Sequence, residues 1–133
     1  MQITRQADYA VRAVLYLAGL DNGRRAPTSE IARNQHIPPS FLAKIVSQLS
    51  VAGVVQTSRG ARGGVSLARK SDEISLLEVV EAIDGPIMLN ECVLNGNACV
   101  FGDDCPVQDV WCNAQDTLVQ KLRGTSFATL ITQ

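Results

Sequence analysis

Four cysteines dominate the second half of this 133-residue chain. Cys92, Cys99 and Cys105 follow a C-x6-C-x5-C spacing within a stretch rich in glycine, asparagine and aspartate. Three thiolates in such a loop can hold a soft metal centre, either zinc or iron–sulfur. Structural zinc sites normally carry paired C-x2-4-C knuckles, which this spacing lacks, so the pattern favours iron–sulfur. One coordination position is left for another side chain or a small molecule, as suits a labile sensor; the alternative is a set of reduced, unliganded thiols.

The fourth cysteine and the single histidine are weaker candidates for ligands. Cys112 lies beside Trp111 on an apolar stripe, where a cysteine commonly packs as a small hydrophobic side chain. We therefore expect a structural role for Cys112, with a ligand role as the less favoured alternative. His36 lies far along the chain from the other three cysteines and is not assigned to the metal.

The composition is that of a single globular domain, with 46% hydrophobic and 19% charged residues. No apolar run approaches the roughly 18 residues that a membrane span needs, so no membrane partner is expected. Charge close to the N-terminus is unlike a secretory signal, which predicts a cytoplasmic protein. In that reducing compartment, cysteines are expected to bind metal or do redox chemistry rather than form disulfides.

The net charge of −1 hides a strong asymmetry along the chain. Residues 1–70 hold ten basic and three acidic side chains, a net of +7, whereas residues 71–133 hold two basic and ten acidic ones, a net of −8. A half this basic favours a polyanionic partner such as DNA, because neutralising phosphates supplies most of the sequence-independent binding energy. The alternative is a protein whose two halves face each other.

The basic half carries the pattern of a helix-turn-helix. Apolar residues at helical spacing predict a first helix over residues 2–20, followed by a short helix over 29–34 that Thr28 or Ser29 caps. A third helix begins near Pro39 and ends at Gly53, after a tight connection over 35–38. Its predicted inward stripe is Leu42, Ile45, Val46 and Leu49, and its predicted outward face is Ser40, Ala43, Lys44 and Ser47. A plain helical hairpin is the alternative.

A short hairpin is predicted directly after these helices. Two β-prone runs, 54–57 and 65–67, flank a glycine-rich turn that bears Arg59 and Arg62. Glycine lets a backbone approach DNA closely, and arginine suits the negative potential of a narrow minor groove. The hairpin is therefore predicted to be a DNA-binding wing rather than an ordinary polar loop. The predicted fold class is mainly α with a small β wing: a winged helix-turn-helix followed by a long C-terminal dimerisation helix.

Beyond residue 70 the pattern changes, which divides the chain into a DNA-binding region, 1–70, and a second region, 71–133. Ser75 and Glu78 form a predicted capping box for a helix that runs through Ile83. A cysteine loop is predicted over about 87–105 and a last helix over about 106–123, opened by Pro106. Apolar residues along that helix form either a core stripe or the seam of a homodimer, and they are Val107, Val110, Trp111, Ala114, Leu118 and Leu122.

Three segments resemble the Rrf-type winged-helix transcription regulators, whose members include IscR, NsrR and RirA. They are MQITRQADYAVR over 1–12, RGARGGV over 59–65 and SLLEVVEAIDGP over 75–86, with the three-cysteine loop and the long last helix following in the family's order. The resemblance covers essentially the whole chain. It implies a homodimer that binds an operator in double-stranded DNA and holds an iron–sulfur cluster.

The resemblance also implies the cluster ligands, namely Cys92, Cys99 and Cys105. IscR-like members place a histidine three residues after the third cysteine, where this chain has Gln108. NsrR-like members use an aspartate of the first helix, donated by the other subunit, and Asp8 occupies that position. The alternatives are that Asp8 merely pairs with Arg12 four residues on, and that Cys112 is the fourth ligand.

The resulting expectation is a repressor, not an enzyme, whose operator affinity depends on a [4Fe–4S] cluster that senses nitric oxide, iron or redox state. Alternatives are an IscR-like regulator of iron–sulfur biogenesis with a [2Fe–2S] cluster, and a cluster-free winged-helix regulator controlled by a protein partner. A ferredoxin-type electron carrier would have no use for the basic half. The expected DNA contacts are Ser40, Phe41 and Lys44 in the third helix, Arg59 and Arg62 in the wing, and Thr4 and Arg5 at phosphates.

Overall fold

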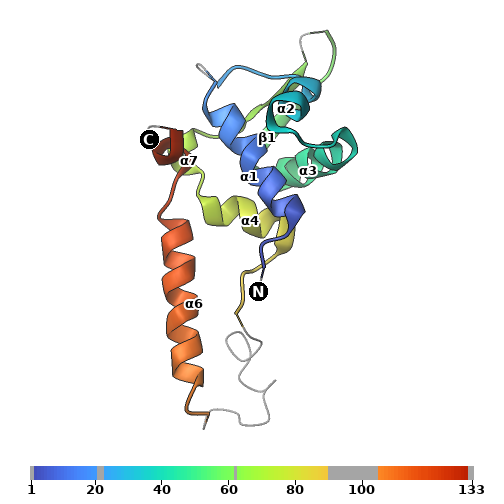
Figure 1. Ribbon diagram of the computed structural model, residues 1–133. Coiled ribbons are helices and arrows are strands. Elements are labelled where there is room, and N and C mark those ends of the chain that lie inside the picture. The colour runs from blue at the N-terminus through green and yellow to red at the C-terminus, as the bar shows by residue number, and fades with distance from the viewer. Residues whose placement is uncertain (1, 21–22, 62, 90–104, 132–133) are drawn as a thin grey trace.

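The computed structural model describes residues 2–20, 23–61, 63–89 and 105–131. It is mainly helical with one two-stranded antiparallel sheet, which confirms the predicted fold class (Figure 1). The elements are α1 (Arg5–Ala18), α2 (Thr28–Gln35), α3 (Pro39–Val51), β1 (Val55–Ser58), β2 (Gly64–Leu67), η2 (Ser71–Glu73), α4 (Leu76–Asp84), α6 (Gln108–Arg123) and α7 (Phe127–Ile131). Within these described ranges, no helix is long and apolar enough to cross a membrane.

The first helix, α1, lies at the centre of the fold. It begins at Arg5 rather than at residue 2, because the Thr4 hydroxyl accepts a hydrogen bond from the Ala7 amide at 3.1 Å and so caps the helix. Its buried face includes Ala7, Ala10 and Val14, each fully buried. The predicted apolar face is therefore confirmed at these three positions. Ile3, which was expected on the same face, is 48% exposed before the helix begins, and the helix is shorter at both ends.

Helices α2 and α3 form the predicted helix-turn-helix. The chain turns between them at His36, whose φ of 54° is left-handed, and Pro38 prevents α2 from continuing. All four residues of the predicted inward stripe of α3 are buried. The predicted side-chain cap of α2 is wrong: the helix starts after Pro27, whose carbonyl accepts from the Glu30 amide at 3.0 Å, and no side chain caps it.

A small network of side-chain hydrogen bonds connects α2 to α1. The Tyr16 hydroxyl donates to the Glu30 carboxylate, and Arg24 Nη2 donates to the same oxygen at 2.9 Å. The hydrogen bond from Tyr16 lowers the pKa of Glu30, assisted by Arg24, and the same bond raises the pKa of Tyr16. Glu30 is therefore held ionised, and its charge is already neutralised within the domain.

Strands β1 and β2 pair in antiparallel register from Val55 opposite Leu67 to Ser58 opposite Gly64, as the wing prediction requires. At two positions of this hairpin, glycine is required by close packing of the backbone as well as by the predicted access to DNA. A Cβ on Gly63 would lie 2.3 Å from the Ser58 carbonyl oxygen, and one on Gly64 would lie 2.7 Å from that of Ala26. Only glycine lets the hairpin close this tightly against itself and against residue 26.

The capping box of α4 is only half formed. The Ser75 hydroxyl accepts from the Glu78 amide at 3.1 Å, as predicted. The Glu78 carboxylate does not return to the Ser75 amide; it pairs with Arg69, which follows the wing. Arg69 also donates to the carbonyls of Gly53 at 3.4 Å and Glu73 at 3.1 Å. This side chain therefore joins α3, the wing and α4.

The long helix α6 extends along one side of the molecule, away from the helical body, and only its C-terminal half approaches α4 (Figure 1). There Leu118 and Leu122 pack against buried Leu77 and Val80. The first part of the predicted stripe is exposed, with accessible fractions of 48% for Val107, 59% for Val110 and 40% for Trp111. A core role for that part of the stripe is therefore excluded in the single chain.

The final helix, α7, was not anticipated from the sequence. Phe127 is fully buried in the main core, and its amide donates to the Ile74 carbonyl at 3.1 Å. The main core thus combines residues from both sides of position 70, such as Ile45 with Ile74. The division at residue 70 stays a prediction about function, because the packing does not follow it.

Burial of Phe127 leads to the first prediction. Phe127→Ala should lower the free energy of unfolding by about 3–5 kcal/mol, because it removes a fully buried aromatic ring and leaves a cavity. Urea denaturation followed by circular dichroism measures this. Ile131→Ala, on the same helix at a position that is 40% exposed, is the control and should cost much less. Equal effects of the two substitutions would contradict the placement of α7.

Candidate nucleic-acid interface and metal centre

The outward face of α3 places the predicted DNA-reading residues together. Ser40, Ala43 and Lys44 are exposed in its first two turns, as predicted. Phe41 is 42% exposed, and its ring centroid lies 6.1 Å from that of Tyr9 on α1, with the ring planes tilted by 51°. Phe41 is therefore partly accessible to solvent and also packs the recognition helix against α1.

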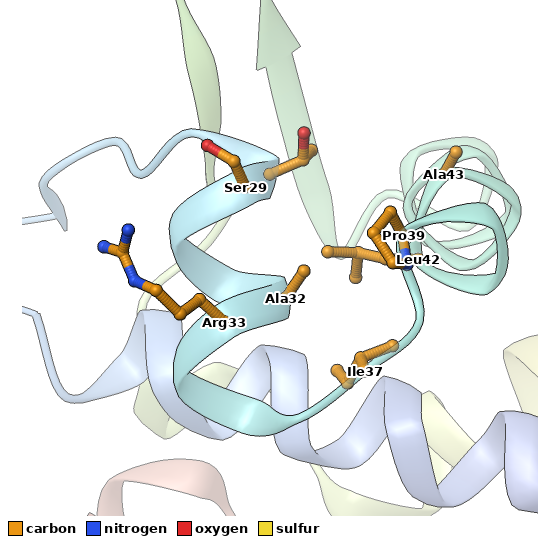
Figure 2. A pocket seen from close by; sticks show the side chains of 8 residues that line it. Ser29, Ala32, Arg33, Ile37, Pro39, Leu42 and Ala43 are labelled. Carbon is orange, nitrogen blue, oxygen red and sulfur yellow. The ribbon is translucent and has the colours of Figure 1, made fainter.

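A half-open pocket of about 390 Å³ separates α2 from α3 beside this face. In Figure 2, Ser29, Ala32 and Arg33 on α2 lie opposite Pro39, Leu42 and Ala43 on α3, with Ile37 on the connection between them. The Arg33 side chain runs away from the hollow, so the hollow itself is mainly apolar. Sequence reasoning had placed Ala43 on the outward face but gave no indication of the pocket.

The wing adds a second cationic position. Arg59 is exposed at the end of β1, whereas Arg62 lies outside the described residues. Within the described part of the chain, no salt bridge involves Arg5, Lys44 or Arg59, and the recorded pairs use Arg12, Arg24 and Arg69 instead. The positive charge on α3 and the wing is therefore not neutralised internally and can meet an external anion.

The start of α1 is organised by a residue that sequence reasoning missed. Asp84, the last residue of α4, accepts from the Thr4 hydroxyl at 2.5 Å and from the Thr4 amide at 3.2 Å. Because the Thr4 hydroxyl already donates to Asp84, its hydrogen is committed within the domain. Arg5 is exposed next to it. The only sequence signal at Asp84 was its place before Gly85-Pro86, which indicated a helix end.

The predicted metal centre is described only in part. Cys92 and Cys99 lie outside the described residues, while Cys105 and Cys112 are half-buried free thiols. No group of three potential ligands gathers within the ranges that the structure describes. A cluster would therefore need Cys92 and Cys99, and the donor set of three thiolates with one further ligand is chemically suited to iron–sulfur.

Asp8 is positioned on the exposed first turn of α1. Its carboxylate pairs with Arg12 at 3.0 Å, and both side chains are more than half exposed, so the pair stabilises by only about 0.2–0.5 kcal/mol. The neighbouring Ala7 packs near the C-terminal half of α6, whereas Cys105 precedes the other end. The helix rises about 15 Å from Gln108 to Leu118. Asp8 is thus accessible from solvent, and its only recorded partner in the described part of the chain is Arg12.

Comparison with known proteins identifies the family to which this fold belongs. Residues 3–133 match the family described as Rrf2, "Iron-dependent Transcriptional regulator". The HTH-type transcriptional regulator NsrR of Geobacillus kaustophilus is 32% identical over 132 residues, which cover 98% of this chain and 90% of that protein.

Two solved structures have the same fold. CymR (YrzC), the global cysteine regulator of B. subtilis, superposes with a TM-score of 0.84 at 25% identity, covering 99% of this chain and 97% of that one. T. potens IscR superposes with a TM-score of 0.77 at 21% identity, covering 99% and 87%. With a winged helix-turn-helix in place and a family match over nearly the whole chain, this protein belongs to the Rrf2 family of transcription regulators.

Proposed function

We propose that this Rrf2-family regulator is a homodimeric repressor whose affinity for its operator is controlled by an iron–sulfur cluster. The observation that carries the DNA-binding part is the exposed, unpaired positive charge of Lys44 and Arg59 on a winged helix-turn-helix. The cluster part rests on the C-x6-C-x5-C spacing and on the family's description as iron-dependent.

On DNA, α3 would enter the major groove with its N-terminal residues against base edges. Ser40, Phe41 and Lys44 stand on that face, and Arg59 with Arg62 would enter the adjacent minor groove. Arg5 would contact a phosphate. Thr4 could join it only by exchanging its bond to Asp84 for one to the phosphate.

The pocket between α2 and α3 suggests what one part of the operator contains. Pro39, Leu42 and Ala43 line its α3 side, and none of these side chains can hydrogen-bond a base. An apolar surface at a base edge recognises the 5-methyl group of thymine. We therefore assign this hollow to a thymine, with the flanking Lys44 on the phosphates or on a guanine.

Dimerisation would use the exposed apolar face of α6. Val107, Val110 and Trp111 are 48%, 59% and 40% exposed in the single chain. Covering large apolar side chains of this kind is favourable, at about 25 cal/mol per Å² of apolar area. Two copies joined through α6 would match the two-fold symmetry of an operator with two half-sites.

The cluster would be held by Cys92, Cys99 and Cys105, with Asp8 of the partner subunit as the fourth ligand. Such a cluster supplies an iron centre that reacts with nitric oxide and oxidants and that depends on iron supply. Asp8 stands on α1, which braces α3 through Tyr9 and Phe41, so binding or releasing the Asp8 carboxylate would act directly on the recognition helix. Position 108 is a glutamine rather than the histidine of IscR-like members, which favours [4Fe–4S] over [2Fe–2S].

The similarity to CymR, a global cysteine regulator, favours a second candidate function. In it the same winged helix is controlled without a cluster, through the thiols themselves or through a protein partner. Control through the thiols makes DNA binding depend on the cysteines, as a cluster would, whereas control by a protein partner does not. The iron content of the protein distinguishes the cluster from both.

Removing the wing charge tests the DNA interface. Arg59→Ala should weaken binding about tenfold and lower the slope of log Kd against log salt by about one, because the minor groove loses one cation that neutralises the flanking phosphates. The measurement is fluorescence anisotropy on an operator selected from random duplexes. Arg123→Ala, an exposed arginine of α6, is the matched control. If both variants bind like the unaltered protein, the wing is not part of the interface.

Replacing thymine by deoxyuridine tests the pocket. In the selected operator, the substitution at one half-site position should weaken binding by about fourfold, the value of one buried methyl group. The same replacement outside the half-sites is the control and should have no effect. If no half-site thymine depends on its methyl group, the assignment of the pocket is wrong; if selection yields no duplex, the DNA-binding proposal itself fails.

Asp8→Ala tests the fourth ligand. After anaerobic purification, native mass spectrometry should show one [4Fe–4S] per subunit in the unaltered protein. The variant should lose most of the difference in Kd between cluster-bound and chelator-treated protein. Arg12→Ala is the matched control, since it breaks the same ion pair but keeps the carboxylate. Equal behaviour of the two variants would contradict the ligand role. A [2Fe–2S] increment would favour the IscR-like alternative, and protein without iron after reconstitution would favour the cluster-free one.

A further inference from the structure

Residues 84–89 run from the last residue of α4 into the start of the cysteine loop and are held by side chains from other elements. We refer to this segment as the strap. Gln115 is the one buried side chain of α6, with an exposed fraction of 6%. Its Oε1 accepts from the Leu89 amide at 2.9 Å, and its Nε2 donates to the Ile87 carbonyl. The amide of Gln115 therefore binds the strap backbone on both sides of Met88, as a neighbouring strand would.

The strap is also bound to the helical body. The Ile87 amide donates to Glu81 Oε2 at 3.2 Å, and the Ile87 side chain is buried against Ala7 of α1 and Val80 of α4. A buried polar side chain costs free energy unless it is satisfied. The amide of Gln115 is satisfied by the strap, so displacing the strap would leave Gln115 without these two partners.

The first residue of the strap contacts α1 directly. Asp84 accepts hydrogen bonds from both the hydroxyl and the amide of Thr4. The same hydroxyl accepts a hydrogen bond from the Ala7 amide and so caps α1. Loss of Asp84 would free the end of the helix that also carries Asp8. The path continues through the contact between Tyr9 and Phe41 to the recognition helix.

Both ends of the cysteine loop are thus anchored on α6. Cys105 precedes the helix covalently, and its carbonyl accepts from the Gln108 amide at 3.2 Å. Leu89, three residues before Cys92 in the sequence, is held by Gln115. The contacts of Leu89 and Ile87 with Gln115, and of Asp84 with Thr4, therefore connect the start of the loop to α1.

We propose that the strap transmits the state of the cysteine loop to the recognition helix, with Gln115 and Asp84 as its positioning residues. This inference rests on the proposed function, because it supplies a route by which the cysteines act on DNA affinity. It is separate from the Asp8 ligand: the strap lies within one chain and would act whether or not Asp8 binds the cluster.

The test compares two states of the cysteines in full-length protein. The first is anaerobically purified protein, and the second is the same protein after iron chelation and alkylation with iodoacetamide. The quantity is the ratio of their Kd values for the selected operator. Gln115→Met keeps the chain length but loses both hydrogen bonds, and Asp84→Asn leaves one acceptor oxygen for the two Thr4 donors and removes the charge. Each should reduce the ratio by about fivefold or more.

Matched controls separate transmission from stability. Gln120→Met is the same substitution at an exposed position of α6, and Asp72→Asn removes the same charge from an exposed site on η2; both should keep the ratio of the unaltered protein. Hydrogen exchange provides a second measurement. Alkylation should change protection of the first turn of α1 in the unaltered protein but not in Gln115→Met.

The outcomes distinguish this proposal from the one on which it rests. A ratio of one in the unaltered protein would overturn both, because the cysteines would not act on DNA binding. A large ratio that persists in Gln115→Met and Asp84→Asn would overturn the strap alone. Weaker binding of both states by the same factor would also overturn it, since that is the effect of a merely structural side chain.

Discussion

The close packing of α1 against its neighbours is the constraint on which the rest of the structure depends. Ala7, Ala10 and Ala13 are almost completely buried, and because their side chains end at Cβ, other elements can approach the helix backbone closely. Contacts with α1 are made by α2, α3, α4, β2 and α7. The recognition helix α3, the wing and α7 thus all pack against α1. A larger side chain on this face would separate all of them, since tight interiors tolerate added volume poorly.

The same arrangement explains how a chain with almost no net charge presents a cationic surface. Of the acidic residues in the first half that the structure describes, Asp8 pairs with Arg12 and Glu30 with Arg24 and Tyr16. Arg69 forms a salt bridge with Glu78, which lies in the second half of the chain. These pairs use acids to position helices rather than to shield the face formed by α3 and the wing, and the field of that face is available to DNA.

Control of DNA binding requires that a change in the second half reach α3, and the fold offers short routes. In the proposed mechanism, one is the carboxylate of Asp8 on the exposed side of α1, as a ligand of the partner subunit's cluster. The other is internal, from Gln115 through the strap to Thr4. Both end on α1, which contacts α3 through the Tyr9 and Phe41 rings. Because α1 contacts so many other elements, a small shift of α1 would affect more of the structure than a shift of any one of them.

Local patterns in the sequence determined the helix-turn-helix, the inward stripe of α3, the wing and the stop at Gly53, because periodicity and turn chemistry act over a few residues. The spacing of Cys92, Cys99 and Cys105 also singles out these three residues as candidate ligands, which stays a prediction. The tertiary structure decided the rest. Glu78 pairs with Arg69 instead of completing its capping box, Phe127 in a five-residue helix fills the core, and Asp84 and Gln115 bind backbone groups 80 and 26–28 positions away. Such contacts depend on which segments the fold brings together, and no periodic signal along the chain records them.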